Sequence, residues 1–233
     1  MLPLKDNVPT RRFPVVTVGL IAVNVLVFLF YEDAGQGIGF LQAVDEAAYH
    51  PCEVEDSCPQ VGEDWPLTIF TSMFMHAGWG HLLGNMLFLW IFGNNVEDTL
   101  GRGRFLLFYL LGGLAATLAQ TFVTLNWGTA ADARIPNLGA SGAIAAVLGA
   151  YFILIPHSQV LTLVLPFFLF PIPAWIFLGI YFVYQALIGG LSFVQPQSGG
   201  GVAYFAHLGG IAFGLLTVKL FATGRPRPVR PLY

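Results

Sequence analysis

Residues 202–222 read VAYFAHLGGIAFGLLTVKLFA, an apolar run close to the roughly 20 residues that cross a bilayer as a helix. The run contains His207, and an ionisable side chain at membrane depth is costly enough to mark a candidate functional site. Gly210 and Gly214 are four residues apart, so they share one helix face and permit close approach of a neighbouring helix. The run therefore predicts a tightly packed membrane helix that contributes to a site.

The whole chain has the composition of an integral membrane protein. Of its 233 residues 56% are apolar and only 10% are charged, whereas soluble domains are about one quarter charged. The runs are continuous, unlike the alternating segments of about ten residues that form membrane β-barrels. The sequence therefore predicts an all-α membrane protein with six transmembrane helices, at about 14–31, 82–96, 105–125, 140–155, 172–190 and 202–222.

A seventh apolar segment, 160–170, is too short to span a bilayer and contains Pro166. We interpret it as interfacial or re-entrant. The net charge is −3 and no basic stripe is visible, so nucleic acid is not an expected partner. The expected surroundings are the lipid bilayer.

Charge placement predicts the orientation of the helices. Cytoplasmic flanks of membrane helices have an excess of Lys and Arg. Here only Arg134 falls in a loop of the opposite parity, and the acidic loop 32–64 has neither Lys nor Arg. Both termini are therefore predicted to be cytoplasmic and loop 32–64 external. The basic residues on the cytoplasmic side are Lys5, Arg11, Arg12, Arg102, Arg104, Lys219, Arg225, Arg227 and Arg230.

We expect one domain, a six-helix membrane unit over residues 13–222. Residues 1–12 form a cytoplasmic arm, and the proline- and arginine-rich segment 223–233 is predicted to be a disordered cytoplasmic tail. The two cysteines, Cys52 and Cys58, lie in the external loop, where a disulfide is plausible and two free thiols are the alternative. A metal site at these cysteines is disfavoured because no fourth ligand is near in the sequence.

Three polar groups of residues interrupt the apolar runs at similar depth. They are His81-x-x-x-Asn85, Gly139-Ala140-Ser141-Gly142 and Ala206-His207-x-x-Gly210-x-x-x-Gly214. With cytoplasmic termini, the helices that carry them all begin at the external face, so the groups can form one site near the outer leaflet. A hydroxyl, two imidazoles and an amide are the side chains used in nucleophilic acyl transfer. Small residues on the helix at 140–155 match Gly210 and Gly214 and predict that these two helices pack together.

These motifs, together with His76 five residues before His81, resemble those of the rhomboid intramembrane serine proteases over residues 66–222. The resemblance implies that Ser141 is the nucleophile and His207 its general base. It also implies an oxyanion hole formed by His81, Asn85 and the backbone N–H of Ser141. His76 matches a supporting residue, and no metal or cofactor is implied.

Two positions depart from the family pattern. A Trp-Arg pair that members often have in the first loop is replaced by Leu67-Thr68, which puts membrane anchoring of the loop in doubt. An aromatic residue often stacks on the catalytic histidine four residues after the serine, and here that residue is Ala145. Glu97 and Asp98 lie at the opposite, cytoplasmic end. The sequence therefore predicts a Ser–His dyad without an acidic third member.

The predicted function is intramembrane serine endopeptidase activity on transmembrane protein substrates, cut near their outer ends. The expected location is a cell membrane, with the active site opening to the extracytoplasmic side. The alternative is a catalytically silent rhomboid-like protein that binds membrane clients. An α/β-hydrolase is disfavoured because Ala143 replaces the second glycine of Gly-x-Ser-x-Gly, and a zinc protease because His-Glu-x-x-His is missing.

Overall fold

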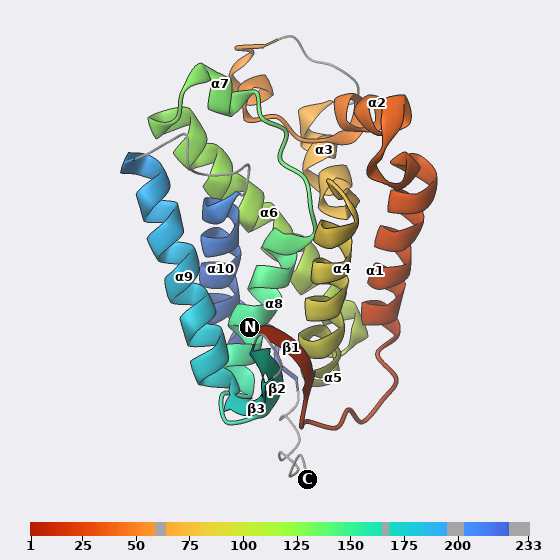
Figure 1. Ribbon diagram of the computed structural model, residues 1–233, viewed down its shortest axis with the longest axis vertical. Coiled ribbons are helices and arrows are strands. Elements are labelled where there is room, and N and C mark those ends of the chain that lie inside the picture. The colour runs from red at the N-terminus through yellow and green to blue at the C-terminus, as the bar shows by residue number, and fades with distance from the viewer. Residues whose placement is uncertain (59–63, 165–167, 195–202, 224–233) are drawn as a thin grey trace.

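The computed structural model describes residues 1–58, 64–164, 168–194 and 203–223. Its long helices run side by side along the length of the molecule (Figure 1). The predominantly helical prediction is confirmed, and the helices follow the predicted apolar runs. They are α1 (Val15–Leu26) continued by η1 (Val27–Tyr31), α4 (Trp79–Phe88) continued by η5 (Leu89–Gly93) and α5 (Asn94–Leu100), α6 (Arg102–Trp127), α8 (Ser141–Leu154), α9 (Ala174–Val194) and α10 (Tyr204–Phe221).

Among the described helices, three are long and apolar enough to cross a membrane. These are α6, α9 over Ala174–Leu191, and α10. The apolar segments Val15–Tyr31 and Ser141–Leu154 are shorter. The 14 residues of α8 extend about 21 Å at 1.5 Å per residue, less than the roughly 30 Å of a hydrocarbon core. Six crossings and cytoplasmic termini therefore stay predictions.

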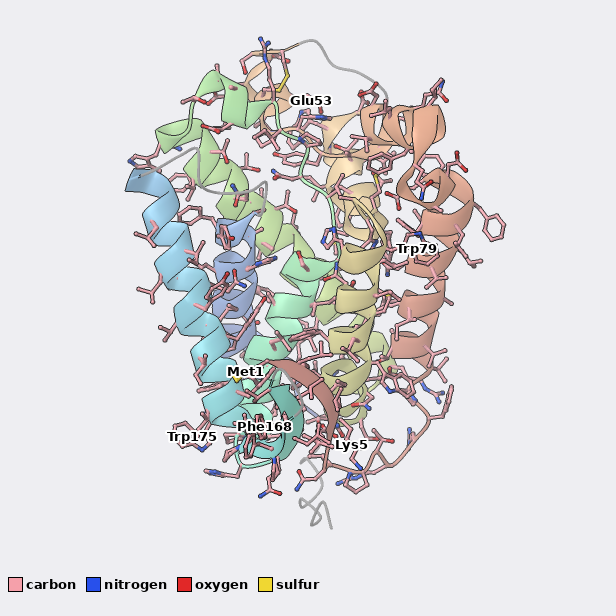
Figure 2. All side chains as sticks on the ribbon, viewed as in Figure 1. Met1, Lys5, Glu53, Trp79, Phe168 and Trp175 are labelled. Atoms are coloured by element: carbon pink, nitrogen blue, oxygen red, sulfur yellow. A yellow bond between two sulfur atoms is a disulfide. The ribbon has the colours of Figure 1, made fainter. Side chains whose placement is uncertain are left out.

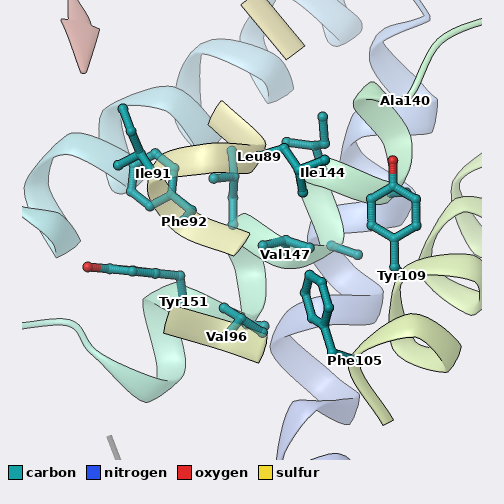
Figure 3. Packing of buried hydrophobic residues seen from close by; sticks show 14 of the residues in the cluster. Leu89, Ile91, Phe92, Val96, Phe105, Tyr109, Ala140, Ile144, Val147 and Tyr151 are labelled. Atoms are coloured by element: carbon teal, nitrogen blue, oxygen red, sulfur yellow. The ribbon is translucent and has the colours of Figure 1, made fainter. Parts of the chain in front are cut away.

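Helix α8 forms the centre of the bundle. Every residue from Gly142 to Tyr151 is buried, because α8 contacts α4, α6, α9 and α10. Its apolar side chains pack in a cluster with residues of η5, α5 and α6 (Figure 3). The cluster includes Leu89, Phe92, Val96, Phe105, Ile144, Val147 and Tyr151. A central helix packed on all sides fixes the position of its first residue, Ser141.

Helices α8 and α10 approach each other closely enough for their backbones to touch. A β-carbon added to Gly210 would overlap the carbonyl oxygen of Gly142, and one added to Gly214 would overlap that of Ala146. In the other direction, a β-carbon on Gly149 would lie 2.6 Å from the carbonyl oxygen of Ile211. The predicted packing of the small-residue faces is therefore confirmed.

The all-α prediction is wrong at one end of the molecule. Strands β1 (Leu2–Asp6), β2 (Gln159–Val164) and β3 (Phe168–Pro173) form an antiparallel sheet in the order β1-β2-β3. Its strands come from the predicted N-terminal arm, residues 1–12, and from in and around the segment 160–170, which we interpreted as interfacial or re-entrant. The β-branched residues of β2 favour an extended backbone, and β1 supplies a partner from the far end of the sequence. Figure 2 shows Met1, Lys5, Phe168 and Trp175 together at this end of the bundle.

The first strand is tied to the central helix by a buried polar network. Asp6 accepts hydrogen bonds from the Tyr151 hydroxyl and from Asn95 Nδ2, both at 2.6 Å. The Tyr151 hydroxyl is also 2.9 Å from Ser158 Oγ. Burial raises the pKa of Asp6 to about 6. The sheet is thus fixed to the end of α8 opposite Ser141.

The acidic loop folds over the other end of the molecule, where α2, α3 and α7 lie (Figure 1). It contains η2 (Asp33–Gly35), α2 (Gly37–Ala47) and η3 (Pro51–Glu55), and is followed by α3 (Trp65–Thr71) and η4 (Ser72–Phe74). Helix α7 (Ala130–Ala133) belongs to the later loop between α6 and α8. Cys52 and Cys58 form a disulfide in the acidic loop. The predicted disordered tail lies outside the described residues from position 224 onward.

Candidate active site

Ser141 is the first residue of α8 and is placed there by two loop contacts. The N–H of Gly139 donates to the carbonyl oxygen of Ser72 at 2.8 Å. Two residues earlier, Asn137 exchanges backbone hydrogen bonds with Tyr49 of the acidic loop, at 2.7 and 3.3 Å. The chain then turns into α8 at Gly139, whose φ of +126° favours glycine. The first N–H groups of a helix have no acceptor within the helix, so this turn is a favourable place for a developing negative charge.

His207 projects from α10 onto the hydroxyl of Ser141. Its Nε2 lies 2.8 Å from Ser141 Oγ, within the range of an O–H···N hydrogen bond. The histidine is only 8% exposed. The backbone contact between α8 and α10 at Gly142 and Gly210 lies one turn away, so it sets the distance between these two side chains. The structure thus brings together the serine and the histidine that the motifs suggested.

The second ring nitrogen of His207 has a partner that the sequence reasoning missed. Gln185 on α9 lies with its Oε1 3.0 Å from His207 Nδ1. Gln185 is only 5% exposed. It is the one amide side chain in the apolar run 172–190, and a lone polar residue in such a run is the signal that could have found it.

His81 is presented beside Ser141 by the start of α4. The N–H of Ala77 donates to His81 Nδ1 at 3.4 Å, which leaves Nε2 as the protonated nitrogen of a neutral ring. A β-carbon added to Gly139 would lie 2.9 Å from His81 Nε2 and 3.7 Å from Ser141 Oγ. Both atoms therefore face the same small space next to Gly139, and a larger residue at position 139 would fill it.

Asn85, one turn after His81, supplies a second donor from α4. Its side chain is 8% exposed, and its Nδ2 is buried without a hydrogen-bond partner among the described residues. A buried amide donor without a partner is costly in an ordinary core, where such groups are nearly always paired. A donor of this kind, next to a candidate nucleophile, suits an oxyanion that exists only during a reaction.

His76 lies behind His81 and is fully buried. Its backbone N–H donates to both carboxylate oxygens of Glu32, at 2.8 and 3.1 Å. Its ring meets that of His81 edge to face, with centroids 5.1 Å apart. Burial raises the pKa of Glu32 to about 7, and burial together with nearby His81 lowers the pKa of His76 to about 3. Glu32 therefore anchors the turn before α4, a role hidden in the sequence because it looks like one more acidic loop residue.

The structure shows the surroundings of the two positions that depart from the family pattern. Ala145 is fully buried on α8, and a β-carbon on Gly210 would lie 3.1 Å from its own β-carbon. On α3, Leu67 is exposed and Thr68 is buried. Across the described residues, no three His, Cys, Asp or Glu side chains gather as metal ligands.

The chain is similar to a family of known proteins. Residues 63–223 match the model of the rhomboid domain. The chain is 34% identical over 152 residues to Rhomboid protein 1, mitochondrial, of Saccharomyces cerevisiae, covering 64% of this chain and 40% of the relative. It is 34% identical over 153 residues to Presenilin-associated rhomboid-like protein A, mitochondrial, of Danio rerio, covering 64% and 36%.

A bacterial relative is the Rhomboid protease GluP of Bacillus subtilis, which is 36% identical over 137 residues, covering 59% of this chain and 24% of the relative. The chain thus spans less than half the length of each of these three relatives. The domain match includes the candidate site residues from His76 to His207. On this evidence the chain belongs to the rhomboid family.

Proposed function

We propose that this protein is a serine endopeptidase that hydrolyses peptide bonds in or near transmembrane segments of other membrane proteins. The observation that carries the proposal is the 2.8 Å contact between Ser141 Oγ and His207 Nε2 inside an apolar helical bundle. The name of the Bacillus subtilis relative, a rhomboid protease, supports the same activity class.

In the proposed reaction Ser141 Oγ attacks the carbonyl carbon of the scissile bond, while its proton passes to His207 Nε2. The tetrahedral intermediate collapses as the C–N bond breaks, and His207 gives the proton to the leaving amine. Water then attacks the acyl-enzyme with His207 again as base, which releases the acid and restores the serine. Acid–base assistance of this kind contributes about 10²–10⁴-fold in rate.

The oxyanion of both tetrahedral intermediates is assigned to the space beside Gly139. His81 Nε2 and the unpaired Nδ2 of Asn85 would donate to it, together with the N–H of Ser141. The Ser141 N–H is fixed by the first turn of α8, and the contact from the Ala77 N–H to Nδ1 orients the His81 ring. Loss of one such donor costs on the order of 10²–10³ in kcat.

Orientation and location follow from the charge pattern of the sequence. We propose six membrane crossings with cytoplasmic termini, and a site that opens to the extracytoplasmic side of a cell membrane. The acidic loop lies at the end of the molecule from which the chain runs from α7 down to the start of α8 (Figure 1). Two relatives are named as mitochondrial and one is bacterial, so the membrane of residence is a separate proposal.

The test is cleavage of a single-span membrane protein in proteoliposomes that contain the purified chain. The wild type is expected to cut the substrate at one position near its outer end, and Ser141→Ala and His207→Ala are expected to be inactive. Ser57→Ala, which changes an exposed serine of the acidic loop, is the matched control and should cut normally. Substrate that binds the wild type but stays intact would favour the silent, client-binding alternative.

A further inference from the structure

The imidazole of His207 is held from both sides. Ser141 lies at Nε2, and the Gln185 side chain lies at Nδ1 with its amide oxygen facing the ring. An amide oxygen only accepts hydrogen bonds, and a neutral imidazole has a single N–H. The proton of His207 must therefore be on Nδ1 for the second bond to form. Nε2 is then the nitrogen with a lone pair, as the general base requires.

Gln185 is itself held by a neighbour on α9. The hydroxyl of Tyr181, one helical turn earlier, hydrogen-bonds Gln185. Residues at i and i+4 meet on one helix face, so this contact needs no third element. Much of the rest of α9 faces outward, as the exposed side chains of Ile180, Tyr184 and Leu187 show. Gln185 is buried and Tyr181 is partly buried, so this pair lies on a side of α9 that faces the bundle.

Among the described residues, Gln185 is the hydrogen-bond partner of His207 Nδ1. The side-chain hydrogen bonds of His207 in the described part of the chain go to Ser141 and Gln185. Neither of these two partners of the ring is a carboxylate. The aromatic ring that the family resemblance places after the serine is replaced by Ala145, which is fully buried.

We propose that Gln185 is the positioning residue of this site, which fixes the orientation and tautomer of His207 through a Ser141–His207–Gln185 hydrogen-bonded chain. The inference rests on the proposed function and adds a third member to its dyad. Because the amide is neutral, it orients the ring without adding a charge to stabilise the imidazolium, unlike the aspartate of a serine protease triad. The three residues of this hydrogen-bonded chain come from three helices, α8, α10 and α9.

The tautomer is tested by NMR on the full-length protein with ¹⁵N-labelled histidine, in detergent micelles. There are five histidines, and the signals of His207 are assigned from the spectrum of His207→Ala. We expect a protonated Nδ1 and an unprotonated Nε2 in the wild type and in Gln185→Glu, which keeps an acceptor oxygen. Gln185→Met, of similar volume, is expected to show both tautomers. A proton on Nε2 in the wild type, or an unchanged spectrum in Gln185→Met, would overturn the assignment.

The consequence for catalysis is tested with the cleavage assay. Gln185→Met is expected to lower kcat about tenfold or more with KM and the thermal midpoint unchanged, and Gln185→Glu to restore most of the rate. The matched control is Gln120→Leu. Gln120 of α6 accepts a hydrogen bond from the N–H of Ala206, next to His207, but does not touch the ring. The Gln120→Leu substitution should lower the thermal midpoint and leave kcat unchanged.

Failure of the two proposals would look different. If the wild type cuts its substrate and Gln185→Met cuts at the same rate, the role of Gln185 is wrong and the protease activity stands. If no variant cuts anything, the proposed function is wrong. The NMR experiment then decides by itself whether Gln185 orients the ring.

Discussion

Helix α8 has two sides that are built differently. Toward α10 and α6, small residues allow the helix backbones to touch, as at Gly142 with Gly210 and at Ala146 with Gly214. Toward α4 and α9, the site depends on individual polar side chains, above all Asn85 and Gln185. We infer that backbone packing fixes the distance between nucleophile and base, while the polar side chains fix orientation and charge. The first side should govern folding and the second side only the chemistry.

The largest effect is expected where the packed side is broken. In Gly214→Val, the β-carbon would overlap the Ala146 carbonyl oxygen, so α10 must move away from α8. We expect a loss of stability of several kcal/mol, at the high end for single substitutions, and no measurable cleavage. Thermal unfolding in detergent measures the stability. The matched control is Gly179→Ala on α9, where an added β-carbon meets nothing within 4 Å.

An unchanged thermal midpoint in Gly214→Val would contradict our claim that the backbones of α8 and α10 are in contact. A large loss in Gly179→Ala would show instead that any glycine substitution in these helices is harmful, which removes the contrast between the two sides.

The Asn85→Ala substitution removes one polar side chain from the side of α8 that faces α4 and leaves the packed side unchanged. Because Asn85 Nδ2 has no hydrogen-bond partner among the described residues, its removal should not lower the thermal midpoint. The rate of peptide cleavage should fall on the order of 10²–10³-fold, because one oxyanion donor is lost. Cleavage kinetics and thermal unfolding of the same preparation separate the two effects. A fall in stability without a fall in kcat would assign Asn85 a structural role only.

A smaller effect is expected from Glu32, which supports His76 and the turn before α4. Its pKa is raised to about 7 in the folded protein, from 4.5 for an ordinary glutamate, because it is buried. The folded state therefore binds this proton more tightly, so its contribution to stability falls as pH rises from about 4.5 to about 7 and is level above. In Glu32→Gln, which keeps an acceptor for the His76 N–H, this slope should disappear.

Thermal midpoints of the wild type and Glu32→Gln between pH 4 and pH 8 measure the difference. Asp6, with a pKa raised to about 6, contributes to the slope in both proteins and cancels in the comparison. Parallel curves would show that the Glu32 carboxyl does not titrate in this range.

Much of the packed side was predictable from the sequence, because apolar runs and glycine spacing are local signals. The positions of the helices and the contact between α8 and α10 followed from them, as did the candidates Ser141 and His207. The sheet was not predictable, since β2 looks like a short apolar run and its partner β1 lies over 150 residues away in the chain. Glu32 was missed because it looks like one more acidic loop residue and its partner His76 comes from another element. Gln185 stands out as the one amide of its apolar run, but the sequence does not reveal that it meets His207.

The central claim is that Ser141 is a nucleophile activated by His207. It is tested most directly by treating the purified protein with a fluorophosphonate and locating the covalent adduct by mass spectrometry of its peptides. The account predicts a single adduct on Ser141 that forms in the wild type and is lost in His207→Ala, while Ser57→Ala is modified normally. An unmodified Ser141 in folded wild-type protein, or modification that persists at the same rate in His207→Ala, would contradict it.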